Sequence, residues 1–123
     1  MNKPWLNLSI VVGLVCMLAP SVLANFQEGL DAYERGDYDT ALKEFRPLAE
    51  QGYPLAQSYL GGMYAEGEGL LKDYVLAHMW MNLAAAKRVK KAGKGRDLLE
   101  ILMTPAQLAE AQRLAREWTL KGA

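Results

Sequence analysis

The stretch LAQSYLGGMYAEGEGLLKDYVLAHMWMNLAAA, residues 55–86, decides how this chain folds. Large and small apolar residues recur along it at steps of three and four, which is the spacing of amphipathic helices. Gly61 and Ala77 let two helix axes come close together, while Tyr64 and Trp80 fill the space beside them. The stretch therefore predicts one helical hairpin.

The turn of this hairpin is marked by Glu66-Gly67-Glu68-Gly69, which interrupts the first helix. Asp73 is placed to cap the second helix, because its side chain can accept a hydrogen bond from a free N–H of the first turn. A single hairpin cannot bury its own apolar stripe. It has to stack on another copy.

The rest of the chain supplies these copies. Gly29 aligns with Gly61 at an offset of 32 residues, whereas residues 37–41 align with residues 73–77 at an offset of 36. The difference predicts an insertion of four residues in the second turn. Hairpins that recur at such a period indicate stacked helical repeats.

These residues resemble the Sel-one-like repeat, a longer-looped relative of the tetratricopeptide repeat. The positions that carry the resemblance are Ala56, Leu60, Gly61, Tyr64, Gly67, Gly69, Asp73, Ala77, Trp80, Ala84 and Ala85. The first copy, with residues 36–42, which include Ala41, and with Phe45, is nearer to the plain tetratricopeptide form, and residues 96–115 resemble the terminal segment of many bacterial members. The resemblance implies an all-α fold: a short solenoid of antiparallel helix hairpins, with about two repeats and a C-terminal capping helix pair.

The last helix has a clear start signal. Thr104 can cap it, Pro105 suits its first position, and Gln107 can reach back to complete a capping box. The apolar face that follows consists of Leu108, Ala111, Leu114, Ala115 and Trp118. We expect this helix to cover the exposed end of the second hairpin.

Residues 1–24 have the pattern of a secretory signal peptide. Lys3 precedes an apolar run over residues 8–18, and Val22-Leu23-Ala24 places a cleavage site after Ala24. We therefore expect residues 25–123 to form the repeat domain of an exported protein, periplasmic or secreted. The alternative is an uncleaved membrane anchor, although the run is short for a bilayer span of about 20 residues.

A basic segment, residues 87–96, follows the second hairpin. Residues 25–86 hold four basic and ten acidic side chains, a balance of −6, whereas residues 87–123 hold nine basic and four acidic ones, a balance of +5. A basic run can indicate nucleic acid or an anionic membrane surface, or it can be a solvated helix end before a glycine hinge. We favour the helix end, because no aromatic residues are interleaved for base stacking and an exported protein rarely meets nucleic acid.

Candidate catalytic and metal-binding groups are few. The single histidine, His78, has no second histidine or cysteine to share a metal, and we expect it to be partly buried. Glu66, Glu68 and Asp73 lack the spacing of a calcium loop and are expected to be solvated loop acids plus a helix cap. Ser58 lies mid-helix without a base at a readable spacing. We therefore expect no enzyme activity, no metal and no cofactor.

Two classes of function remain. In the first, the protein is a non-catalytic adaptor or scaffold that binds a peptide or partner protein in the groove of its helical repeats, which is also what the resemblance implies. In the second, it is a hydrolase that acts on an envelope substrate, as claimed for some cysteine-rich relatives. The second class has less support, because no cysteine follows Cys16 and no nucleophile–base pair is evident.

Helical geometry predicts which side chains line such a groove. If Gly29 and Gly61 face the neighbouring helix, positions three before and one, four and five after each glycine face the groove. These residues are Phe26, Leu30, Tyr33 and Glu34 in the first hairpin and Ser58, Gly62, Ala65 and Glu66 in the second. The alternative is that Phe26, Leu30 and Tyr33 close the N-terminal end of the core, because terminal repeats are normally atypical.

The export hypothesis predicts a processed chain. Mass spectrometry of the envelope fraction should find a protein that begins at Asn25, because the residues up to Ala24 are removed by signal peptidase. An intact chain that begins at Met1 and is embedded in the membrane would contradict the prediction.

Overall fold

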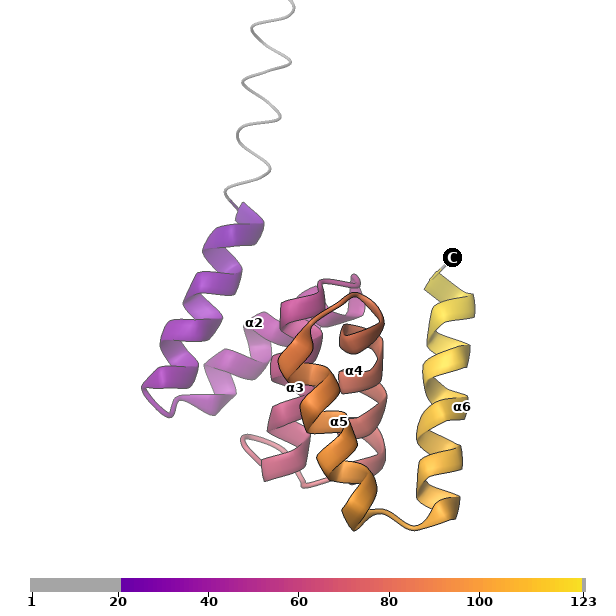
Figure 1. The fold of residues 1–123 in the computed structure, drawn as a ribbon. Coiled ribbons are helices and arrows are strands. Elements are labelled where there is room, and N and C mark those ends of the chain that lie inside the picture. Colours follow the sequence, from indigo (N-terminus) through magenta and orange to yellow (C-terminus); the bar gives the residue numbers. More distant parts are fainter. Residues whose placement is uncertain (1–20, 123) are drawn as a thin grey trace, which may run out of the picture.

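The computed structural model describes residues 21–122, in which six helices follow one another (Figure 1). They are the helical residues 21–34, α2 (Tyr38–Glu50), α3 (Pro54–Glu66), α4 (Tyr74–Ala86), α5 (Lys90–Leu102) and α6 (Pro105–Gly122). This part of the chain contains no strand, so the predicted all-α fold is confirmed. Most of the predicted signal peptide, residues 1–20, lies outside the described residues. Among the described helices, none has the length and apolar character that crossing a membrane would require.

The turns of the two hairpins differ as the repeat alignment predicts. The first turn covers residues 35–37 and the second covers residues 67–73, so the insertion lies between α3 and α4. Gly67 ends α3 with a left-handed φ of 69°, a conformation that side chains other than glycine rarely adopt. The Asp73 carboxylate caps α4 by accepting a hydrogen bond from Leu76 N at 3.0 Å. Both predicted helix boundaries are therefore confirmed.

The helix α4 is the centre of the fold. It packs against α3 in the second hairpin and also contacts α5 and α6. In contrast, α5 and α6 have few contacts with each other, and Figure 1 shows α6 beside α4 and away from α5. The last helix pair is therefore splayed across α4.

The side chain of Met81 on α4 lies between two glycines of neighbouring helices. A Cβ atom at Gly61 on α3 would lie 2.7 Å from Met81 Cγ and 3.1 Å from the carbonyl oxygen of Ala77. A Cβ atom at Gly95 on α5 would lie 2.9 Å from Met81 Sδ. Real Cβ atoms essentially never lie within 3.0 Å of another heavy atom, so the close approach of both helices to Met81 depends on the absence of a side chain at Gly61 and Gly95.

The helix α6 begins and packs as its sequence predicts. Thr104 Oγ1 accepts a hydrogen bond from Gln107 N at 3.1 Å, while Gln107 Oε1 accepts one from Thr104 N at 2.9 Å, which completes the capping box. Ala111 and Ala115 are buried, and the Trp118 ring meets the Trp80 ring of α4 edge to face at 6.1 Å between centroids. This helix therefore covers the second hairpin, as expected.

The predicted glycine hinge is wrong. Gly93 and Gly95 both lie inside α5, which also contains four of the basic residues of the segment 87–96. Glycine is a poor helix former, and this is why the sequence pattern favours a hinge. Packing against α4 overrides that preference, because Gly95 accommodates Met81 and Ala92 is buried.

Alanine substitutions at two adjacent glycines of α3 should change the free energy of unfolding in opposite directions. Gly61→Ala should lower the free energy of unfolding by about 1–3 kcal/mol, because its methyl group overlaps Met81 and Ala77. Gly62→Ala should raise it by up to about 1 kcal/mol, because its Cβ meets nothing within 4 Å and alanine favours a helix. Urea unfolding of both variants measures this contrast, and equal shifts would contradict the close approach of α3 and α4.

Candidate functional site

Tyr59 of α3 joins the first helices of all three helix pairs. Its ring lies 6.2 Å from the Phe26 ring and 5.5 Å from the Tyr33 ring, both on the helical residues 21–34. On the other side, the Lys91 ammonium of α5 lies 4.5 Å from the centroid of the Tyr59 ring. This is a cation–π contact, and it shows that helix 21–34, α3 and α5 lie side by side.

The predicted groove residues of the first hairpin divide into two groups. Phe26, Leu30 and Tyr33 are half-buried and pack against the core cluster around Phe45. The Phe26 and Phe45 rings lie 5.6 Å apart. Glu34 is exposed. The first three side chains thus contribute to the N-terminal end of the core, and only their uncovered edges are available to a partner.

The predicted groove residues of the second hairpin also differ in exposure. Ser58 is 5% exposed, so it offers almost no surface. Gly62 has open space where a Cβ would point, Ala65 is half-buried and Glu66 is exposed. On α3, the accessible part of the predicted groove is therefore centred on Gly62 and Glu66.

The contact of Lys91 with Tyr59 joins the exposed sides of α3 and α5 in a surface that we term the α3–α5 face. It consists of Leu55, Tyr59 and Gly62 on α3 and of Lys91, Leu98 and Leu102 on α5. Within each helix these positions follow steps of three, four or seven, so each set shares one side of its helix. Leu55 is 51% exposed, and Leu98 and Leu102 are 65% and 63% exposed. The α3–α5 face is therefore largely apolar, with the Lys91 cation within it.

Sequence reasoning missed the α5 half of this surface. It treated the basic segment as the end of a helix. The first helix of the third pair, α5, was therefore not predicted to lie beside α3. The signal that was present is the spacing of Lys91, Leu98 and Leu102, which puts three side chains on one side of a helix. The contact between Lys91 and Tyr59 is needed to show that this side adjoins α3.

The insertion turn is tied to the first hairpin by a polar contact. The Tyr33 hydroxyl donates a hydrogen bond of 2.9 Å to Glu68 Oε1. Gly69 lies against Tyr38, because a Cβ at Gly69 would be 3.0 Å from Tyr38 Cβ. The expectation that Glu68 is only a solvated loop acid is therefore wrong. Burial of the hydroxyl, together with the bond to Glu68, raises the pKa of Tyr33 to about 12.

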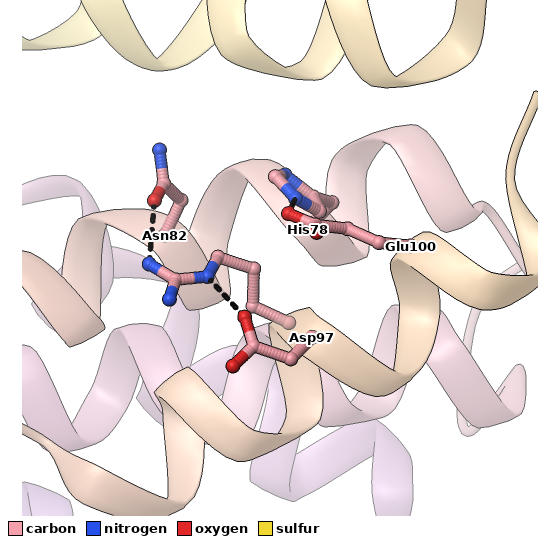
Figure 2. Close-up of polar contacts among 5 residues, drawn as sticks. His78, Asn82, Asp97 and Glu100 are labelled. Carbon is pink, nitrogen blue, oxygen red and sulfur yellow. Dashed lines mark hydrogen bonds and ion pairs between the residues drawn. The ribbon is translucent and has the colours of Figure 1, made fainter. Parts of the chain in front are cut away.

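Two polar contacts join α4 to α5 (Figure 2). His78 is 1% exposed, so it is fully rather than partly buried, and its Nε2 lies 2.9 Å from Glu100 Oε1. Arg96 Nη1 donates a hydrogen bond of 3.1 Å to Asn82 Oδ1, and Arg96 Nε donates one of 3.1 Å to Asp97 Oδ1. These contacts hold α5 on α4 and engage the only histidine of the sequence in packing.

Three of the six basic side chains of the segment 87–96 have partners within the protein. Lys87 Nζ donates a hydrogen bond to the carbonyl oxygen of Gly52 and lies 5.7 Å from the Trp118 ring. Arg96 and Lys91 have the partners described above. Within residues 21–122, no three histidine, cysteine, aspartate or glutamate side chains form a group that could hold a metal ion.

Comparison with known proteins identifies a related solved structure. Neither a protein-family model nor a curated protein sequence matches the chain. Among solved structures, the chain is similar to a protective antigen present in uropathogenic Escherichia coli strains, which displays an SLR (Sel-one-like repeat) fold. The TM-score is 0.75 and the identity is 31%, and the match covers 83% of this chain and 23% of the antigen chain. The chain thus spans about a quarter of the antigen's length.

The Tyr33–Glu68 contact predicts how stability changes at alkaline pH. The usual pKa of tyrosine is near 10, so the unfolded chain releases the Tyr33 proton at a lower pH than the folded chain does. The contribution of Tyr33 to stability is therefore fully present below about pH 10 and is lost as the pH rises through about 12. Urea unfolding at about pH 9 and about pH 11 should show a smaller loss for Tyr33→Phe than for the wild type. Equal losses would contradict the assignment.

Proposed function

Because this chain is an SLR-fold helical repeat protein, we propose that it is a non-catalytic interaction module that binds a peptide or partner protein across the α3–α5 face. The observation that carries the proposal is the chemistry of that face. Leu55 lies one turn from Tyr59 on α3, Tyr59 contacts Lys91 of α5, and the exposed Leu98 and Leu102 follow Lys91 at helical spacing along α5, while Gly62 has open space where a Cβ would point. Apolar and aromatic side chains beside a charge are the groups that most often anchor a bound partner.

Charged side chains in and beside this face suggest the character of the bound segment. Glu34 and Glu66, on helix 21–34 and α3, are exposed, whereas Lys91 and Lys94 lie on α5. A peptide with an apolar anchor over Tyr59 would place a basic residue toward Glu66. It would place an acidic residue toward the two lysines, since opposite charges across an interface favour one orientation.

The expected export of this chain favours a partner that is located in the envelope or outside the cell. The cation, apolar run and cleavage pattern of residues 1–24 are those of a signal peptide. The matched relative is described as a protective antigen, which agrees with exposure of such a protein outside the cytoplasm.

A non-catalytic role agrees with the state of the candidate nucleophile and base. Ser58 is buried within α3, and His78 is buried with its Nε2 engaged by Glu100. A nucleophile needs a neighbouring base and access to the substrate, and neither is available to Ser58. Inactivity of the purified protein on peptidoglycan and β-lactam substrates would agree with this assignment.

A pair of leucine substitutions tests the binding surface. Leu98→Glu should reduce recovery of a stoichiometric partner from the envelope fraction by at least about tenfold, the effect of roughly 1.4 kcal/mol of binding free energy. Leu71→Glu is the matched control, because Leu71 is 89% exposed on the insertion turn and lies outside the α3–α5 face.

Both variants should melt like the wild type, because both leucines are largely solvated. Glu66→Lys should also weaken the partner, through the reversed charge beside Gly62. Undiminished recovery with Leu98→Glu and Glu66→Lys would contradict this assignment of the binding surface.

A further inference from the structure

A groove of about 430 Å³ lies between α4 and α6, on helices that contribute nothing to the α3–α5 face. It exists because α6 packs on α4 while having few contacts with α5. Its apolar lining comes from Leu83 and Ala86 on α4 and from Ala115 and Leu120 on α6. Leu83 and Ala115 are buried, whereas Ala86 and Leu120 are exposed.

The polar groups of this groove include free hydrogen-bond donors. Asn82 lines the groove, and its Oδ1 accepts the hydrogen bond from Arg96. Only the amide oxygen can accept from a guanidinium, so the amide nitrogen is the atom that remains unused. Figure 2 shows that nitrogen on the side of α6, opposite the bond to Arg96. Asn82 therefore directs a donor toward the groove, and Arg96 fixes its orientation.

Arg116 contributes a positive charge to the same groove. Among the described residues it has no hydrogen bond or ion pair, and neither does Gln112, which also lines the groove. No aspartate or glutamate is among the lining residues. The surface thus combines an apolar floor with an unpaired guanidinium and amide donors, so its charge and hydrogen-bonding groups complement an anion.

We propose that the α4–α6 groove binds the C-terminal carboxylate of an apolar peptide. A guanidinium binds a carboxylate through two parallel hydrogen bonds, and the Asn82 amide can donate a further one. The apolar lining receives the last side chain of the peptide. The volume lies within the range of roughly 300–1,000 Å³ of small-ligand sites, so it suits the end of a chain better than a long segment that passes through.

Fluorescence anisotropy with the purified full chain tests the proposal. The probe is a fluorescein-labelled peptide that ends in Leu-Leu with a free carboxylate, and the comparison is the same peptide with a C-terminal amide. We expect the acid to bind and the amide to lose at least about tenfold in affinity, because the charge-assisted hydrogen bonds are lost. An amidated peptide with an internal aspartate tests whether a side-chain carboxylate is sufficient.

Two arginines of α6 provide a matched pair of variants. Arg116→Gln should weaken binding of the acid by at least about tenfold. Arg113→Gln removes the same charge from the same helix but should leave binding unchanged, because Arg113 is engaged by Glu110 and Glu117 and does not line the groove. Ala86→Leu should also weaken binding without lowering the melting temperature, because the added atoms enter the groove from an exposed position.

The proposal is overturned if the acid does not bind, if the amide or the internal aspartate peptide binds as well as the acid, or if both arginine variants weaken binding equally. These outcomes are independent of the α3–α5 face. Leu98→Glu should leave peptide binding at the groove intact, so failure at one surface is distinguishable from failure at the other.

Discussion

The arrangement of the helices depends on the contact of Met81 with two glycines. The Met81 side chain extends from α4 between Gly61 of α3 and Gly95 of α5, so close that a Cβ at either position would force it to shift. Methionine suits this position because its unbranched, flexible side chain fills irregular space. The contact brings three helices of two successive pairs together, and the positions of Tyr59 and Lys91 on the α3–α5 face follow from it.

Polar contacts then fix the elements that apolar packing alone would leave loosely oriented. Tyr33 holds the insertion turn through Glu68, while His78 and Asn82 hold α5 through Glu100 and Arg96. A directional bond between partly buried groups favours one register over its neighbours, because the alternatives leave a donor or acceptor unpaired. In a small repeat protein, where each repeat contacts only the adjacent repeats, such contacts add specificity where the core is thin.

The splayed last helix pair gives the molecule two surfaces of different chemistry. The α3–α5 face is apolar and aromatic with a cation contacting its central tyrosine, and it lies on the first helices of their pairs. The α4–α6 groove lies on the second helices and presents an unpaired arginine and a fixed amide donor. If α6 packed closely on α5, the apolar side of α6 would be buried between these two helices. Packing on α4 instead leaves a groove whose lining includes the guanidinium of Arg116 and the amide nitrogen of Asn82, neither of which has a partner among the described residues.

The sequence by itself determined the repeats, the hairpin turns and the helix starts. These features depend on local chemistry: the left-handed φ at Gly67, the cap at Asp73 and the capping box at Thr104 each involve only a few neighbouring residues. Helical periodicity also predicted the apolar side of each helix of the second hairpin, because the pattern repeats along each helix. Only the tertiary structure decided that the glycines of α5 lie inside a helix, that Ser58 is covered and that Asn82 faces α6. Each of these depends on how one helix crosses another, and contacts between segments distant in sequence set that crossing, whereas a periodic pattern describes a single helix.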